Sequence, residues 1–238
     1  MSTEPTPQLR SATWPTVPRG ATVLVPVGSV EQHGPHLPLD TDTVIATAVA
    51  DGVVARLRET HPYAAPFLVA PAVAYGASGE HQSFAGTSSV GTDVLRLVVL
   101  ELVRSLRTWA GRVVLVNGHG GNVPALEAAV GQLRVEGHDA SWQPCRTETV
   151  DLHAGYTETS LMLHLDRARV RRELAVPGDP RSLATILPAM QHGGVEAVSH
   201  NGVLGDPTGA TGREGARVLS AMVTEVAAAV LDPEPAYR

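Results

Sequence analysis

Residues 112–135, RVVLVNGHGGNVPALEAAVGQLRV, predict a strand, a glycine-rich turn and a helix in direct succession. The run at 112–116 is apolar and rich in valine, which is typical of a strand covered on both faces. Apolar side chains return at helical spacing from 124 to 135. A helix that follows a buried strand indicates a parallel sheet, because a crossover helix joins parallel neighbours.

The same alternation of strand and helix runs through the rest of the chain. A further strand is predicted at 22–27, a short apolar run rich in β-branched residues, and others at 68–73 and 139–142. Further helices are predicted where apolar residues recur every three to four positions, at 43–58, 92–110, 157–165 and 216–231. We therefore expect an α/β fold with a mostly parallel sheet covered on both faces. Residues 1–19 are predicted to form a flexible N-terminal arm, and residues 20–238 a single domain.

The composition excludes several classes of protein. All 18 basic residues are arginine, so no lysine is present for a Schiff base or a phosphate-binding loop. The formal net charge of −6 argues against a nucleic-acid partner. The single cysteine, Cys145, fits a cytoplasmic location because it can form no disulfide within the chain. The first twenty residues hold no long apolar run, so we expect no membrane segment.

Carboxylate and histidine side chains gather after the strand at 22–27. Glu31 and His33 are two residues apart, and side chains at that spacing point the same way in extended chain. Asp42 follows at the predicted start of a helix, where the free N–H groups favour a carboxylate. Imidazole and carboxylate together suit zinc, iron(II) or manganese.

Two further clusters point to the same edge of the sheet. His119 follows the strand at 112–116, and His153 and Glu158 stand near the start of another helix. Each cluster alone is compatible with a polar surface, and the turn at 117–122 with a weak phosphate-binding loop. Ligands of open α/β sheets bind beyond the carboxyl ends of the strands, so the three clusters together predict a metal site there.

These segments together resemble the creatininase family of di-metal amidohydrolases. The likeness covers about residues 25–215 and is carried by Glu31–Pro38 (EQHGPHLP), Asp42, Asn117–His119, and His153 with Glu158–Ser160. The resemblance implies a three-layer α/β/α sandwich and a homo-oligomer, a hexamer or similar ring. It also implies the metal ligands, with the aspartate as the bridge between two ions: Glu31, His33, Asp42 and His119.

Two positions depart from the family members that hydrolyse creatinine. Those members carry a glutamate ligand for the second metal two residues after the turn histidine, where this chain has Gly121. We expect Glu158 to supply the missing carboxylate. They also carry a tryptophan shortly before the later histidine motif, and residues 145–152 contain none. This absence argues against creatinine as the substrate.

Within the family, residues 75–87 and 153–160 most resemble members that cleave a modified precursor peptide. The resemblance implies a peptidase that releases a C-terminal Val-Tyr-derived unit. One alternative is an amidohydrolase acting on a small molecule of the creatinine or formamide type. Another is a non-catalytic binding protein that has lost its second metal through Gly121.

The expected chemistry uses two divalent ions, zinc or iron(II) with manganese as an option, and a hydroxide bound to them that attacks the amide carbonyl. His153, assisted by Glu158, is assigned to catalysis as the proton shuttle, and its alternative role is to orient Glu158. Residues 202–208 are expected to help close the site, from the same or a neighbouring subunit. Four further residues are assigned to substrate binding or support of the ligands: Ser78, Glu80, His81 and His36.

Overall fold

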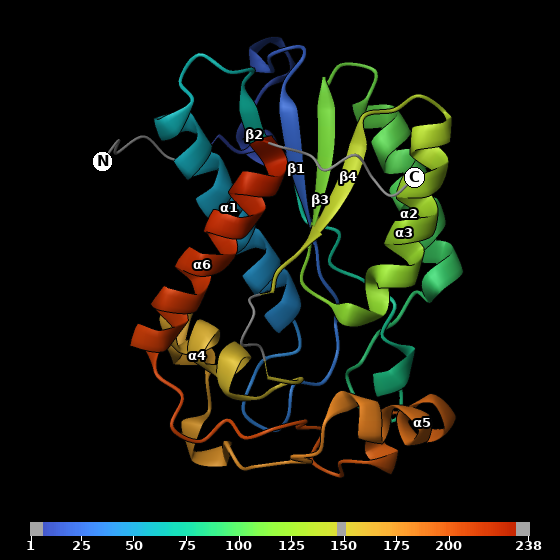
Figure 1. The fold of residues 1–238 in the computed structure, drawn as a ribbon, viewed down its shortest axis with the longest axis vertical. Helices are drawn as coiled ribbons and strands as arrows, with labels where there is room; N and C mark the ends of the chain where they lie inside the picture. Colours follow the sequence, from blue (N-terminus) through green and yellow to red (C-terminus); the bar gives the residue numbers. More distant parts are fainter. Residues whose placement is uncertain (1–6, 147–150, 232–238) are drawn as a thin grey trace.

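The computed structural model describes residues 7–146 and 151–231. Its centre is a parallel sheet with the strand order β2-β1-β3-β4 (Figure 1). The strands are β1 (Thr22–Val27), β2 (Phe67–Val69), β3 (Arg112–Asn117) and β4 (Ala140–Pro144). The two central strands pair along their whole length, from Thr22 opposite Arg112 to Val27 opposite Asn117. The predicted parallel sheet is therefore confirmed.

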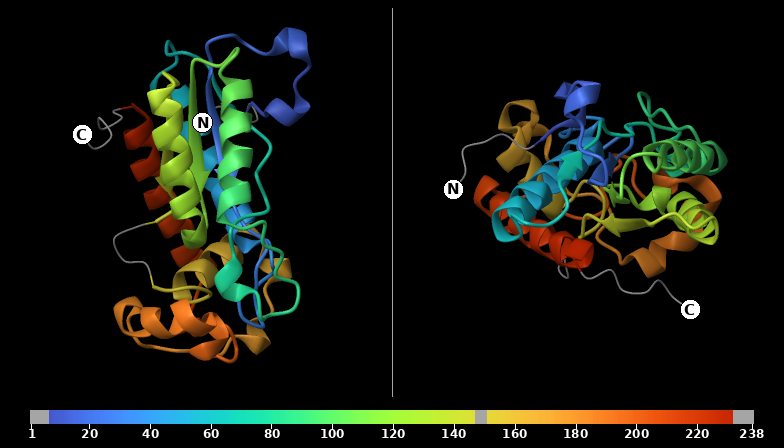
Figure 2. Two further views of the ribbon diagram at one scale, coloured as in Figure 1. Left: turned by 90° about the vertical axis from the view of Figure 1, so that its right-hand side faces the viewer. Right: turned by 90° about the horizontal axis from the view of Figure 1, so that it is seen from above.

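Helices cover both faces of this sheet (Figures 1 and 2). They are α1 (Thr41–Thr60), α2 (Thr92–Leu106), α3 (Val123–Val135), α4 (Tyr156–Leu165), α5 (Leu183–Gly193) and α6 (Gly212–Leu231). One face packs against α1 and α6, with α4 beside them, and the other packs against α2 and α3. The architecture is thus the expected three-layer α/β/α sandwich. Over the described ranges, none of the helices is long and apolar enough to cross a membrane.

The core is divided by the sheet into two apolar clusters. Along β1, Leu24 faces the cluster with α1 and α6, whereas Val23 and Val25 face the cluster with α2 and α3. All three side chains are fully buried. Since successive side chains of a strand point to opposite faces, a strand buried on both faces needs an unbroken apolar run. This requirement explains the sequence TVLVPV of β1.

Several elements differ from the sequence prediction, among them α6, which begins at Gly212 instead of 216. Strand β2 stops at Val69 instead of reaching 73, because Pro71 has no N–H to donate to the ladder. Val73 then rejoins the sheet through an isolated bridge to Val27. Helix α2 ends at Leu106, four residues before the predicted end. Helix α5 was not predicted, because Pro188 lies inside it and Ile186 is its one fully buried side chain in the described structure.

The segment before β1 contains two short 3-10 helices, Leu9–Ser11 and Trp14–Thr16. Leu9 and Val17 pack against the cluster of α2 and α3, and Gln8 forms a bridge with Val69. These contacts place Gln8 beside β2 at the edge of the sheet, and Leu9 and Val17 against the layer of α2 and α3.

Candidate metal centre

The predicted ligands lie where β1 and β3 end, and the loop that follows β1 brings in the first two. Glu31 and His33 are both fully buried. The Nδ1–H of His33 donates to the carbonyl oxygen of Glu31 at 3.1 Å. This bond fixes the orientation of the imidazole ring, so Nε2 of His33 lies on the opposite side, toward Asp42.

Asp42 lies in the first turn of α1 and is buried. Its Oδ1 atom is 3.1 Å from Nε2 of His33, and its Oδ2 atom is 3.5 Å from Nδ1 of His119. The hydroxyl of Ser29 donates to Oδ2 at 2.5 Å. The two carboxylate oxygens therefore face two different histidines, which is the arrangement of a carboxylate that bridges two ions.

His119 follows β3, in a turn held by the side chain of Asn117, which donates to the His119 carbonyl at 2.7 Å. Nδ1 of His119 lies 3.1 Å from Oε1 of Glu31. On the other side of the ring, Nε2–H donates to the carbonyl of Ala77 at 3.1 Å. The ring thus turns one nitrogen toward the carboxylates and the other away from them.

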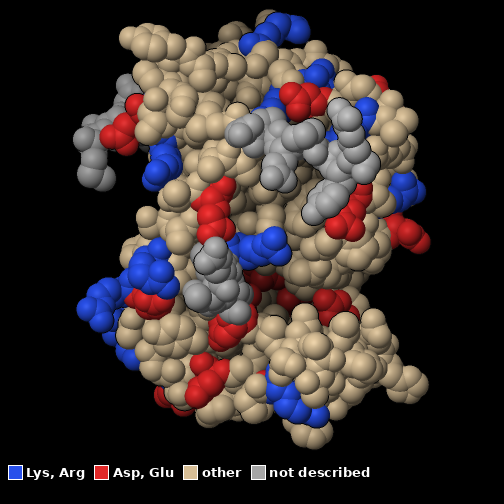
Figure 3. Space-filling view, viewed as in Figure 1, with Lys and Arg blue, Asp and Glu red and all other residues tan. Residues whose placement is uncertain are grey.

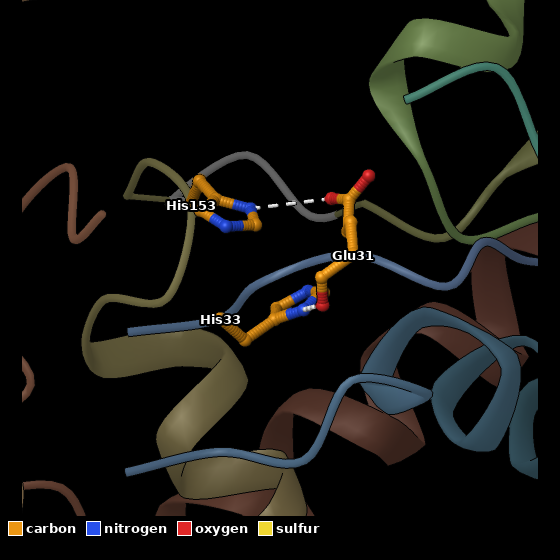
Figure 4. A group of neighbouring side chains, drawn as sticks. All are labelled: Glu31, His33 and His153. Atoms are coloured by element: carbon orange, nitrogen blue, oxygen red, sulfur yellow. Dashed lines mark hydrogen bonds and ion pairs between the residues drawn. The ribbon is translucent and has the colours of Figure 1, made fainter. Parts of the chain in front are cut away.

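His153 and Glu158 reach the same place from the start of α4. Glu158 Oε2 accepts a 2.6 Å hydrogen bond from the backbone N–H of Ala154 and lies 3.9 Å from Nε2 of His33. His153 donates from Nε2 to the carbonyl of Gln32 at 2.7 Å and turns Nδ1 toward Glu31 Oε1 at 3.6 Å (Figure 4). The rings of His153 and His33 are 4.4 Å apart between centroids.

Within the described residues, three groups of side chains bring their ligand atoms within 4.8 Å of one another. The groups are Glu31–Asp42–His119, His33–Asp42–Glu158, and Glu31–His33–His153. The first two share Asp42. Among the described residues, none donates a hydrogen bond to the two buried carboxylate oxygens of Glu31. A buried carboxylate without such bonds is costly, and a cation compensates it, so the residues present fit a metal centre.

The pKa values of the two ligand histidines are raised by the carboxylates around them. Burial opposes the charged form of His33, but Asp42, Glu158 and Glu31 outweigh it and raise its pKa to about 10. Burial likewise opposes charging of His119, and Glu31, Glu80 and Asp42 raise its pKa well above the ordinary value. The cluster therefore favours positive charge at these two histidines.

The other two histidines behave in the opposite way. Burial, together with the charge of His33, lowers the pKa of His153 to about 4. Burial and the neighbouring imidazoles lower the pKa of His81 to about 2. Both rings are therefore neutral near pH 7, and Nδ1 of His153 carries a free lone pair that faces the cluster.

The residues predicted to contact substrate lie at different distances from the cluster. Glu80 and His81 lie in a 3-10 turn, η3 (Gly79–His81), and His81 Nε2 is 3.5 Å from Glu31 Oε1. His36 lies one step further out, where its Nε2 is 2.9 Å from the hydroxyl of Thr159. Burial lowers the pKa of His36 to about 4. The hydroxyl of Ser78 is buried and has no hydrogen-bond partner in the part of the chain that the structure describes. Substrate contact by these residues stays a prediction.

Gln32 is a site residue that the sequence did not single out. Its amide nitrogen donates to Nδ1 of His81 at 2.8 Å and to the carbonyl of Gly202 at 3.0 Å. A Cβ atom on Gly202 would lie 1.9 Å from the Gln32 side-chain oxygen, so only glycine fits there. The N–H of Leu204 also donates to the carbonyl of His153. Residues 202–204 thus lie against the site of their own chain. The sequence feature that could have identified Gln32 is its position between Glu31 and His33, the two candidate ligands after β1.

The site lies close to a surface depression. Figure 3 shows acidic side chains set back in a hollow between the body that carries the sheet and the part that carries α5. In Figure 1, α5 lies beyond the end of the sheet at which β1 and β3 finish.

A parallel α/β sheet with buried imidazole and carboxylate groups beyond its strand ends is the arrangement of a candidate metal-dependent enzyme. Residues 10–230 match the creatininase family model, described as creatinine amidohydrolase, and the chain belongs to this family.

The chain is 57% identical over 221 residues to the mycofactocin precursor peptide peptidase of Mycobacterium tuberculosis strain H37Rv, covering 92% of this chain and 88% of the relative. It is 52% identical over 226 residues to the peptidase of the same name from Mycobacterium ulcerans, covering 94% and 88%.

Solved structures give the same family. A mutant creatininase described as the Zn-Zn type has a TM-score of 0.77 and 25% sequence identity, and the match covers 98% of this chain and 100% of the creatininase chain. A structure described as creatininase Mn has a TM-score of 0.75 and 25% identity, covering 97% and 99%.

Proposed function

We propose that this chain is a dinuclear metal peptidase that removes a C-terminal Val-Tyr-derived unit from a modified mycofactocin precursor peptide. The observation that carries the proposal is the pair of ligand groups that share Asp42. The peptide substrate is supported by the relatives of more than 50% identity that are named for it. The similarity to these relatives covers 92% and 94% of this chain.

The two ions would be held by two sets of ligands. Glu31, Asp42 and His119 would hold one ion, and His33, Asp42 and Glu158 the other. Such mixed nitrogen and oxygen donors suit zinc, iron(II) and manganese. When bound, the ions supply an acidified water and a polarised amide carbonyl.

His153 is the residue of this chain that we assign to proton transfer. Its Nε2–H is held by the Gln32 carbonyl, so Nδ1 is the atom that receives a proton and passes it to the leaving nitrogen. The imidazole is buried and neutral near pH 7, and it faces the cluster at 3.6 Å from Glu31. Residues 202–204 pack beside this ring and help to exclude water.

The alternatives receive less support from the site. Creatinine hydrolysis is disfavoured by Gly121, where creatinine-hydrolysing members carry a glutamate ligand. A binding protein with a single metal is disfavoured by Glu158, whose carboxylate lies 3.9 Å from His33 and completes the second group of ligands. The similarity to the creatinine amidohydrolase of Pseudomonas putida is 31% over 173 residues and covers 60% of this chain.

Assembly and location belong to the same proposal. We place the enzyme in the cytoplasm, as a homo-oligomer that is a hexamer or a similar ring. The outer face of α2 supports an interface, because Val94, Leu97 and Val98 are 50%, 52% and 43% exposed. The lone Cys145 supports a reducing compartment.

The decisive experiment mixes metal-reconstituted protein with the modified precursor peptide and follows the products by mass spectrometry. We expect release of the C-terminal fragment with zinc, iron(II) or manganese and none after chelation. Creatinine and a formamide serve as competing substrates, and Glu31→Gln serves as the inactive variant. If no metal supports release of a fragment, the peptidase proposal is wrong.

A further inference from the structure

The imidazole of His119 is held between two kinds of acceptor. Nδ1 faces Glu31 Oε1 at 3.1 Å and Asp42 Oδ2 at 3.5 Å, whereas Nε2 faces the Ala77 carbonyl at 3.1 Å and Glu80 Oε1 at 3.4 Å. A carbonyl and a carboxylate accept but do not donate, so Nε2 must carry the proton. Nδ1 faces two carboxylates and is protonated as well in the metal-free protein, so a cation that binds between these groups takes the place of the Nδ1 proton.

Gly121 leaves open the space through which Glu80 reaches this ring. A Cβ atom at position 121 would lie 2.6 Å from Glu80 Oε1 and 2.4 Å from His119 Nε2. It would also lie 2.4 Å from the carbonyl oxygen of Ala77. Any side chain here would push the carboxylate of Glu80 away from the imidazole. The absence of a side chain at position 121 therefore allows the Glu80 carboxylate to lie close to the His119 ring.

The turn that carries Glu80 packs against a segment that is distant in sequence. Helix α5 and the 3-10 turn η7 (Val195–Ala197) both pack against η3. Gly194, with φ of +69°, joins these two elements, and a Cβ atom on it would lie 2.7 Å from the Glu80 carbonyl oxygen. This close backbone contact fixes the position from which the Glu80 side chain extends.

We propose that Glu80 is a positioning residue for the ligand His119: its carboxylate lies 3.4 Å from Nε2 in the space left by Gly121 and, beside the Ala77 carbonyl that accepts the Nε2–H, holds Nδ1 toward the metal. The inference rests on the proposed function, in which His119 binds an ion with Glu31 and Asp42. Glu80 itself belongs to none of the three ligand groups formed by the described residues. Partners of this kind orient a ligand histidine and raise its basicity.

Zinc affinity tests this role without any substrate. The two zinc-binding steps are measured by competition with a chromophoric chelator in the wild type, Glu80→Ala, Glu80→Gln and the control Glu196→Ala, which changes an exposed carboxylate on η7. We expect Glu80→Ala to weaken one step by about 10–100-fold and leave the other unchanged. Glu80→Gln keeps an acceptor oxygen and should stay within about threefold of the wild type. Glu196→Ala should bind both ions normally.

The tautomer of His119 gives a second readout. Long-range ¹H–¹⁵N spectra of the zinc-loaded wild type should show a protonated Nε2 and a zinc-bound Nδ1, and the signals are assigned by their loss in His119→Gln. Unchanged affinity and unchanged His119 signals in Glu80→Ala would overturn the inference in favour of a pure substrate contact. Complete loss of one zinc ion would overturn it in favour of direct ligation. A wild type that binds two ions but cleaves no peptide would refute only the proposed function.

Discussion

Asp42 Oδ1 lies 3.1 Å from Nε2 of His33, while the other oxygen of the same carboxylate faces a different histidine 3.5 Å away. One side chain therefore serves both ligand groups. We expect Asp42→Asn to remove both metal ions, because the amide loses the charge and offers one oxygen in place of two. Metal content per chain, measured by mass spectrometry, should fall from about two to near zero.

The matched control for this variant lies on the same helix. Asp51 is also in α1, and it accepts a hydrogen bond from Gln8 far from the ligands. Asp51→Asn should keep both ions and full activity. Retention of two ions by Asp42→Asn would refute the bridging role.

Glu158→Gln should lose one ion and keep the other. Glu158 belongs to the His33 group alone, and the group of Glu31 and His119 does not need it. The backbone N–H of Ala154 can still donate to the glutamine side-chain oxygen, so the local fold should persist. Full occupancy by two ions in this variant would show that Glu158 does not replace the carboxylate absent at Gly121.

His153→Ala should lower kcat by about 10²–10⁴-fold, the usual contribution of a general acid or base, and leave both ions bound. The metal content separates two roles, because His153 also forms, with Glu31 and His33, one of the three groups that could hold an ion. Single-turnover cleavage and metal content are measured on the same sample. Loss of an ion together with activity would make His153 a ligand.

The common location of the candidate ligands was predictable from sequence, because each follows a strand or begins a helix and parallel strands end at one edge. Glu31, His33, Asp42, His119, His153 and Glu158 all lie there. Their assignment as ligands rests on the family resemblance and stays a prediction. The roles of Gln32 and Gly121 were not predictable, since they depend on contacts between loops distant in sequence. Helix α5 was also not predictable, because its contacts too join segments distant in sequence. It packs against η7 and η3, and Ile186 joins Val195 and Leu204 in a small apolar cluster of residues far apart in sequence.

The division of the core by the sheet gives a stability prediction. Leu24 is fully buried on β1 and faces α1 and α6, so Leu24→Ala should lower the free energy of unfolding by about 2–5 kcal/mol. Leu97 on α2 is 52% exposed, and Leu97→Ala should change the free energy of unfolding of an isolated chain by less than about 0.5 kcal/mol. Urea unfolding of the metal-free protein measures both. A similar loss in the two variants would contradict the assignment of the core.

Metal binding should release protons, because the ligand histidines are protonated in the metal-free protein. The pKa of His33 is raised to about 10 and that of His119 well above 6.5, and both rings must be neutral to bind a metal. Near pH 7.5, zinc binding should therefore release about two protons from these rings, and apparent affinity should rise with pH. The release from His33 should fade above about pH 10, where it is already neutral. Calorimetry in buffers of different ionisation enthalpy measures the number of protons. His33→Gln should release about one proton fewer, and release equal to the wild type would show that His33 does not carry the displaced proton.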